Sequence, residues 1–243
     1  MKTIILVLAL FSQLLSAKTL SASYEVSFGV FQTMGIADAR LELNDDQTYR
    51  IRIDARTTGL AKVLSNNRTE TYESRGIVRD GKLIPNVYTK VRKTNSSVTV
   101  KTYTFDHPNK TVWKESLKDS EQSREENEFY ASEDILTLFF NIKYYMKTPQ
   151  NLTLYAIGGN GKDGRIDILY PRGKALETVK KTLDLQSGDF LQVVLNDRIF
   201  SSANGELQIN LASDGLCEKA VLEDVLLFGD IVGQRIHSDQ GSR

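Results

Sequence analysis

The sequence is poor in the side chains that most often carry catalysis or bind metals. It contains one cysteine, Cys217, so no internal disulfide can form, and the signal region lacks the cysteine that a lipoprotein would acylate. It contains two histidines, His107 and His237, with no second ligand at a familiar spacing, which disfavours a histidine-based metal site. Distant carboxylates could still come together around a hard cation, but no EF-hand-like loop is present, so we assign no metal ligand and no cofactor. Lysine plus arginine number 31, and aspartate plus glutamate also number 31. This zero net charge gives no support for a nucleic-acid partner.

Long apolar runs are also missing, with one exception at the N-terminus. Lys2 precedes an apolar run at residues 4–11, and small residues follow that run. This order is typical of a cleavable secretory signal peptide over residues 1–17, cut after Ala17, with a cut after Ala22 as the alternative. An uncleaved anchor is disfavoured because a membrane-spanning helix needs roughly 20 apolar residues. We therefore expect an exported protein that does not span the membrane after cleavage.

What the rest of the sequence has in abundance is alternation of apolar and polar residues. It is clearest at residues 49–56, where tyrosine, isoleucine and alanine face one way and arginine and aspartate the other. Shorter alternating runs occur at residues 36–43, 152–156, 166–170 and 207–211. Turn residues separate the runs at positions 44–46, 80–81, 107–109, 158–161 and 203–205. The pattern predicts one mainly β domain over residues 18–233, built as an antiparallel meander.

One segment has helical periodicity instead. From Ser132 to about Met146, apolar residues recur every three or four positions, with Ser132 as the expected N-cap and two acidic residues behind it. We expect an amphipathic helix here that packs on the open side of the sheet. The residues expected to face inward are Ile135, Leu138, Phe139 and Ile142. Asn141 and Lys143 are expected to face water, so that truncating either should change stability little.

Two further segments are predicted to be irregular. Residues 115–128 are charged and almost free of apolar side chains, which favours a solvated loop or a mobile flap. Residues 234–243 are polar and predict a disordered tail.

The edge strands of a large sheet have unpaired backbone N–H and C=O groups that can pair with other chains. A curved antiparallel sheet or a closed β-barrel limits such pairing, and either creates an interior that the helix would cover. A transmembrane barrel is disfavoured because bands of aromatic residues at both ends of each strand are not evident.

No constellation in the sequence dictates a chemistry. No serine lies in a G-x-S-x-G motif, and the glycine-rich segment 158–164 lacks the G-K-[ST] ending of a phosphate loop, so a hairpin explains it better. Glu133 and Asp134 are adjacent, point about 100° apart on a helix and fit its dipole better than they fit a pair of catalytic acids. Cys217 is expected to be packed and inert. We therefore assign no catalytic, cofactor-binding or metal-ligating residue, and the ligand-binding residues stay unknown.

Two aromatic or basic features have a functional and a simpler interpretation. Arg50, Arg52 and Arg56 share one strand face and would either bind an anion or form the wet face of the sheet, and the second is the commoner case. Trp113, the single tryptophan, would either stack on a ligand or pack at the core or rim.

Several short pieces, taken in order, form a resemblance. They are Tyr24-Glu25-Val26-Ser27-Phe28-Gly29, Gly35-Ile36-Ala37, Thr57-Thr58-Gly59, Glu73-Ser74, Gly81-Lys82-Leu83-Ile84-Pro85, the segment 133–140, Gly205-Glu206-Leu207, Ser213-Asp214 and Phe228-Gly229. Together they resemble a bacterial exported family known as domain of unknown function 3108. The resemblance implies an exported β-rich domain of the Gram-negative envelope, with a periplasmic location, and it implies no activity and no catalytic residues.

The expected function is therefore binding rather than catalysis. The leading hypothesis is a non-enzymatic periplasmic protein whose sheet holds an apolar or amphipathic molecule, such as a lipid or another envelope component, or docks on an envelope partner. One alternative is a hydrolase that acts on glycan or lipid with carboxylates from separate strands. The other is a structural assembly factor of the envelope.

Overall fold

The structure, a computed structural model, describes residues 18–28, 33–159, 163–195, 206–225 and 229–242. The predicted signal peptide, residues 1–17, and the predicted turn at 203–205 lie outside these ranges. The first eight strands are β1 Lys18–Phe28, β2 Thr33–Leu43, β3 Thr48–Thr57, β4 Thr69–Arg79, β5 Lys82–Lys93, β6 Val98–Asp106, β7 Thr111–Lys118 and β8 Glu121–Glu126. The others are β9 Leu152–Tyr155, β10 Arg165–Leu169, β11 Asp189–Leu195, β12 Glu206–Leu211, β13 Cys217–Val225 and β14 Gly229–Ser242. The helices are α1 Gly59–Leu64, α2 Ile135–Phe140, α3 Ile142–Tyr145 and α4 Lys174–Leu183.

The fourteen strands of the described residues all belong to one antiparallel sheet. Its order is β8-β7-β6-β5-β4-β3-β2-β1-β14-β13-β12-β11-β10-β9, so the chain first builds outward from β1 to the β8 edge. It then crosses through α2 and α3 to the other edge, β9, and returns strand by strand to β14 beside β1. The predicted mainly β fold with antiparallel neighbours is confirmed, and of the two predicted forms the structure has the curved sheet that does not close.

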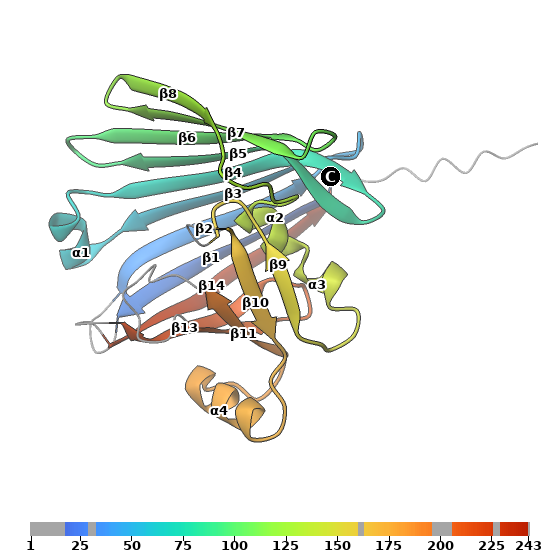
Figure 1. Cartoon of the computed structure of the whole chain (residues 1–243). Helices are drawn as coiled ribbons and strands as arrows, with labels where there is room; N and C mark the ends of the chain where they lie inside the picture. Colours follow the sequence, from blue (N-terminus) through green and yellow to red (C-terminus); the bar gives the residue numbers. More distant parts are fainter. Residues whose placement is uncertain (1–17, 29–32, 160–162, 196–205, 226–228, 243) are drawn as a thin grey trace, which may run out of the picture.

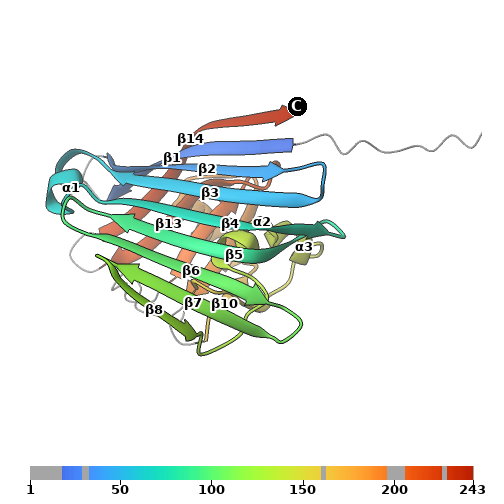
Figure 2. The ribbon, with the colours of Figure 1, turned by 90° about the horizontal axis from the view of Figure 1, so that it is seen from above.

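The sheet curls so that its two ends face the same interior, with α2 between them (Figures 1 and 2). β-branched and aromatic residues in alternation explain the strands, as in β3, where Tyr49 and Ile51 are buried and Arg50 between them is not. The predicted turn at Asp80–Gly81 joins β4 to β5, and both residues have positive φ, the backbone that a tight two-residue hairpin requires.

The interior contains two apolar cores that meet at α2. One core lies under β2–β6 and includes Tyr49, Ile51 and Tyr88 together with Leu136 of α2. The other lies under β9–β12 and includes Leu138 of α2 and Ile142 of α3. The helical segment therefore fills the space inside the curve, as a cover for both halves of the sheet.

The other two helices lie outside this interior. The amphipathic helix α4 was not predicted, and it buries Val179 and Leu183 against Phe190 and Val221 on the opposite face of β11–β13. The short helix α1 lies in the connection between β3 and β4, at one end of the sheet (Figure 1). It leaves Leu60, Val63 and Leu64 between 68% and 75% exposed.

The predicted single helix is two short helices in the structure. The N-cap is Asp134 rather than Ser132, because the Asp134 carboxylate accepts hydrogen bonds from the backbone N–H groups of Leu136 and Thr137. Leu138 and Ile142 are buried as expected, whereas Ile135 and Phe139 are partly buried. Asn141 is 2% exposed, so its expected place in water is wrong.

The prediction of a disordered tail at residues 234–243 is wrong as far as Ser242. These residues form most of β14, and Ser238–Ser242 pair with Lys18–Ala22 of β1. Backbone pairing between strands needs no apolar side chains, and Arg235 is further held by ion pairs to Asp214 and Glu218. The domain therefore extends past residue 233.

The prediction of a loop or flap at residues 115–128 is also wrong for most of that segment. It forms the end of β7 and all of β8, a hairpin at the edge of the sheet. All six residues of β8 are exposed, and a charged edge strand protects a sheet from pairing with other chains.

Candidate functional site

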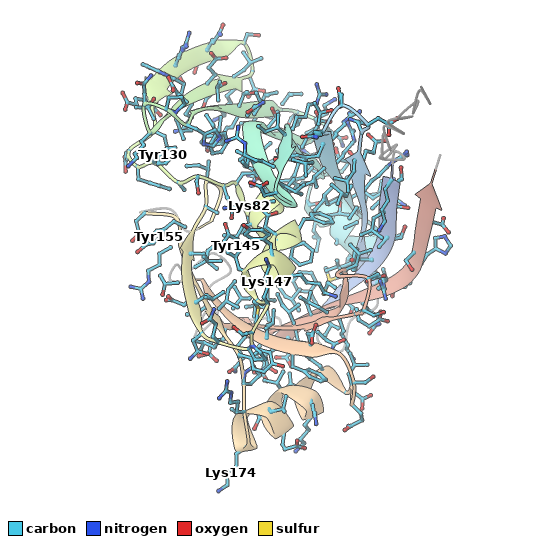
Figure 3. The ribbon with its side chains drawn as sticks, turned by 90° about the vertical axis from the view of Figure 1, so that its right-hand side faces the viewer. Lys82, Tyr130, Tyr145, Lys147, Tyr155 and Lys174 are labelled. Carbon is cyan, nitrogen blue, oxygen red and sulfur yellow. The ribbon has the colours of Figure 1, made fainter. Side chains whose placement is uncertain are left out.

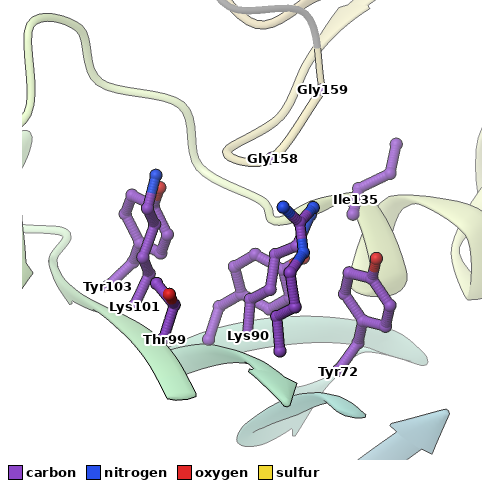
Figure 4. A pocket seen from close by; sticks show the side chains of 10 residues that line it. Tyr72, Lys90, Thr99, Lys101, Tyr103, Ile135, Gly158 and Gly159 are labelled. Atoms are coloured by element: carbon purple, nitrogen blue, oxygen red, sulfur yellow. The ribbon is translucent and has the colours of Figure 1, made fainter. Parts of the chain in front are cut away.

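A cavity lies inside the curve, between strands β4–β6 and the turn that follows β9. Its volume is about 540 Å³. Its lining residues are Tyr72 of β4, Tyr88, Lys90 and Arg92 of β5, Thr99, Lys101 and Tyr103 of β6, Ile135 of α2, and Gly158 and Gly159 of the turn. Figure 4 shows the strand side chains rising toward the Gly158–Gly159 turn, which lies across them. An adjoining space of about 330 Å³ shares Lys101, Tyr103 and both glycines.

Aromatic rings form the floor of this cavity. The Tyr88 and Tyr103 rings stack with their centroids 5.8 Å apart, and Tyr72 lies beside them on the next strand. Gly158 has φ of +85°, and a Cβ there would stand 3.0 Å from a ring carbon of Tyr88. Glycine is therefore the residue that lets the turn approach the tyrosines this closely.

Cations are gathered on the same wall. The Lys90 ammonium lies 5.0 Å from the centroid of the Tyr72 ring, and Lys101 is its cross-strand neighbour. Burial lowers the pKa of Lys90, because a partly dehydrated ammonium loses part of its stabilisation by water.

One carboxylate, Glu70, forms ion pairs with two arginines, Arg68 and Arg92, at the α1 end of this wall. It accepts hydrogen bonds from Arg68 Nη2 at 2.6 Å and Arg92 Nε at 2.7 Å, and from the Tyr72 hydroxyl. Burial acts to raise the pKa of Glu70, but these hydrogen bonds and charges outweigh it and lower the pKa to about 2.

This shift predicts a dependence of stability on pH. Because the folded-state pKa of Glu70 lies below its unfolded value of 4.5, its ionised form stabilises the fold above that pH, and the stabilisation is lost as pH falls toward 2. We expect Glu70→Gln to lower the free energy of unfolding by up to about 3 kcal/mol at pH 7, with the difference shrinking between pH 4.5 and 2. Urea unfolding of both proteins over this range measures it, with exposed Glu121 changed to glutamine as the control. A difference that stays constant with pH would contradict the assignment.

The floor of the site is anchored by buried polar groups around α2. Asp134 Oδ2 accepts from Ser74 Oγ at 2.6 Å, which ties α2 to β4. Glu133 lies next to it with Lys82 Nζ at 3.1 Å and the Tyr145 hydroxyl at 2.6 Å. Figure 3 shows Lys82 beside Tyr145, and Lys82 Nζ lies 4.8 Å from that ring. Both acids hold the start of α2 through these contacts, in line with the prediction that they belong to the helix end and do not form a catalytic pair.

The arginine row and Trp113 lie away from the cavity. Arg50 is paired with Glu73 at 2.6 Å, Arg52 with Asp54 at 2.6 Å and Arg56 with Asp38 at 2.9 Å. The row is thus the charged outer face of β3, the simpler of its two interpretations. Trp113 is 38% exposed at the surface, and its ring centroid lies 5.1 Å from the Arg124 guanidinium.

The remaining sequence candidates are Cys217 and the two histidines. Burial raises the pKa of Cys217 to about 12, which leaves the thiol protonated and unreactive at neutral pH. His107 is bonded through Nδ1 to the Tyr130 hydroxyl and through Nε2 to the Pro85 carbonyl, and His237 lies on the exposed end of β14. Over the described ranges, the structure contains no group of three or more potential metal ligands.

Sequence reasoning missed the residues that line the cavity. In β5 the β-branched residues Val87, Thr89 and Val91 alternate with Tyr88, Lys90 and Arg92, and the second set faces inward. Alternation alone predicts that the more apolar, β-branched set faces the interior. The signal that could have reversed this choice is the recurrence of tyrosine and lysine at matching positions in neighbouring strands.

The chain is similar to known proteins in sequence and in fold. Residues 23–146, just over half of the chain, match the model of a family described as Protein of unknown function (DUF3108). The chain belongs to this DUF3108 family. The match spans β1 to α3 and so includes every strand that lines the cavity, and it confirms the resemblance seen in the sequence. No curated protein matches the chain.

A solved structure shares the fold of this DUF3108 protein. It is the crystal structure of a β-barrel-like protein of domain of unknown function DUF1849 from Brucella abortus, with a TM-score of 0.52 and 9% sequence identity. The alignment covers 94% of this chain and 99% of the other, so the likeness extends over the whole sheet. In the described part of the chain, none of the helices is long and apolar enough to cross a membrane.

Proposed function

We propose that this protein is an exported, non-enzymatic binding protein of the Gram-negative envelope that holds an amphipathic molecule in the cavity between β4–β6 and the β9–β10 turn. The observation that carries the proposal is the cavity itself. Its volume of about 540 Å³ falls within the usual range of small-molecule sites, roughly 300 to 1,000 Å³. Three tyrosine rings and Ile135 offer apolar contact, while the lysines offer charge.

The competing functions fit the cavity less well. A glycan-acting hydrolase needs two carboxyl groups about 5 to 9.5 Å apart around the scissile bond. The ten residues that line the cavity include no aspartate and no glutamate. The adjoining space has three glutamates, of which Glu125 is paired with Lys114, so the acids lie to one side of the cavity and do not flank it, which favours binding. A purely structural assembly factor would have no use for an internal cavity of this size.

Export to the periplasm is part of the proposal and rests on the signal sequence. The register of β1 supports the cut after Ala17, since Lys18 is already paired with Leu43 on one side and Ser242 on the other. A cut after Ala22 would remove nearly half of β1 and its pairing.

Filling the cavity is expected to weaken binding. We expect the purified mature protein to bind the neutral dye N-phenylnaphthylamine saturably, and a long-chain monoacylglycerol to displace it. Thr99→Trp places an indole in the cavity and should weaken both affinities about tenfold or more, equivalent to about 1.4 kcal/mol. Thr104→Trp, on the same strand but exposed on the opposite face, is the matched control and should bind normally. Dye binding that is absent from the wild type, or equal in both variants, would defeat the proposal.

A further inference from the structure

Two lysines face each other inside the cavity without compensation. Lys90 of β5 and Lys101 of β6 are directly opposite in the strand register, and both line the cavity. Like charges in directly opposed positions destabilise a sheet. Within the described residues, neither lysine forms an ion pair, because the nearby Glu70 is shared by Arg68 and Arg92 and the nearby Glu125 is paired with Lys114.

The outer face of the same sheet shows a different arrangement. There Arg50, Arg52 and Arg56 each have a carboxylate partner within 3 Å. These three arginines of the outer face are thus neutralised by acids of the fold, whereas Lys90 and Lys101 in the cavity form no ion pair with a described residue. The cavity itself is lined by three cations, Lys90, Arg92 and Lys101, and by no carboxylate. Glu70 lies beside it in ion pairs with Arg68 and Arg92, and the adjoining space adds Lys114 with Glu125, Glu126 and Glu128.

Hydrogen-bond donors accompany this charge. The Tyr88 and Tyr103 hydroxyls belong to the cavity wall, and neither makes a hydrogen bond to another described residue. Two ammonium groups and two phenol groups together form a donor set suited to an oxyanion. A neutral occupant would leave both ammonium groups unpaired in a partly dehydrated space, where the pKa of Lys90 is already lowered by burial.

We infer that Lys90 and Lys101, with the Tyr88 and Tyr103 hydroxyls, form a head-group site for the carboxylate or phosphate of an anionic amphiphile, whose apolar part lies along Tyr72 and Ile135. The inference rests on the proposed function, that the cavity takes an amphipathic molecule, and adds the sign of its charge. Carboxylate and phosphate present the same oxyanion chemistry to these donors.

Matched probes of one chain length test the inference. Dodecanoate, dodecyl phosphate, neutral glycerol monolaurate and inorganic phosphate are titrated separately into the mature protein by calorimetry, each below its micelle concentration. We expect one or both anionic amphiphiles to bind about tenfold or more tightly than glycerol monolaurate. The tighter of the two tells a fatty-acid from a phosphate head group. The preference should fall with added salt, whereas the neutral affinity should not.

Variants locate the charge. Lys90→Met with Lys101→Met should reduce binding of the anionic amphiphiles to the level of glycerol monolaurate, while binding of the neutral probe is kept and shows that the variant is folded. Lys90→Arg with Lys101→Arg keeps both charges and should keep the preference. Lys93→Met is the matched control, since Lys93 lies on β5 but is exposed on the outer face.

The outcomes separate this inference from the proposed function. Equal affinity of wild type for anionic and neutral probes, or a preference that survives the double methionine variant, overturns the head-group site and leaves the binding function standing. Inorganic phosphate that binds as tightly as dodecyl phosphate also overturns it, because the alkyl chain of the amphiphile would then contribute nothing to the affinity. The absence of binding by every amphiphile overturns both.

Discussion

Asp134→Ala is expected to lower the free energy of unfolding by about 3 kcal/mol or more, a large share of the roughly 5 to 15 kcal/mol that stabilises a domain. Asp134 is fully buried at the start of α2. Its Oδ1 accepts from the N–H groups of Leu136 at 2.9 Å and Thr137 at 3.0 Å. Its Oδ2 accepts from the hydroxyls of Ser74 at 2.6 Å and Thr137 at 2.8 Å. Loss of the cap costs about 0.5 to 2 kcal/mol, and each buried donor left unpaired adds about 1 to 3.

A second substitution shows whether shape or charge matters at Asp134. Burial raises the pKa of this carboxyl, while its four hydrogen bonds act to lower it. Asp134→Asn keeps one acceptor oxygen for the helix N–H groups, and hydroxyls can rotate to accept from its amide. We expect it to cost about half as much as the alanine variant in urea unfolding. The exposed Asp45→Ala should change stability by no more than about 0.5 kcal/mol. An alanine variant at position 134 as stable as that control would mean that water replaces the lost oxygens.

The consequences of Asp134→Ala should extend to the cavity. Ile135, the next residue, lines the cavity, and its N–H donates to the Ile157 carbonyl at 2.9 Å. Ile157 directly precedes the glycines that close the cavity, so α2 and this turn are held together. A loosened α2 should therefore weaken ligand binding in proportion to the loss of order there.

The strands and turns followed from the sequence because their determinants are local. Alternation at residues 49–56 predicts β3, and the Asp80–Gly81 pair predicts the hairpin between β4 and β5. The tail and the β7–β8 hairpin were missed because their order depends on partners elsewhere. β14 pairs with β1 from the other end of the chain, and β8 has no buried face to reveal a period.

The cavity could not be predicted for a related reason. A binding cavity requires polar residues on the inner face of a sheet, so its strands carry the pattern that usually marks a wet surface. Lys90 and Lys101 stand in such positions. Two alternating sets of side chains in β5 could face inward. The set with Tyr88 does so because Tyr88 packs in the core that includes Leu136 of α2, and α2 does not cover the far end of the strand.

Asn141→Ala is the second variant with a large expected effect, and the sequence alone had led us to expect almost none. Asn141 is 2% exposed at the junction of α2 and α3. Its Oδ1 accepts from the Leu83 N–H at 2.9 Å, and its Nδ2 donates to the Leu83 carbonyl at 2.8 Å. The side chain thus pairs with the start of β5 as a neighbouring strand would. The same Nδ2 donates to Glu133 Oε1 at 2.8 Å.

Truncation leaves both backbone groups of Leu83 buried and unpaired, since Leu83 is 6% exposed. Each such group costs about 1 to 3 kcal/mol, so we expect Asn141→Ala to lower the free energy of unfolding by about 3 kcal/mol. Glu133 keeps Lys82 and Tyr145 as partners and adds little to the loss. Lys143→Ala, two residues along, is the control: its ammonium donates to the Ala212 and Ser213 carbonyls at an exposed site, where water can take its place. We expect a change there of no more than about 0.5 kcal/mol. Urea unfolding of both variants decides the matter, and equal small losses would show that Leu83 finds other partners when Asn141 is shortened.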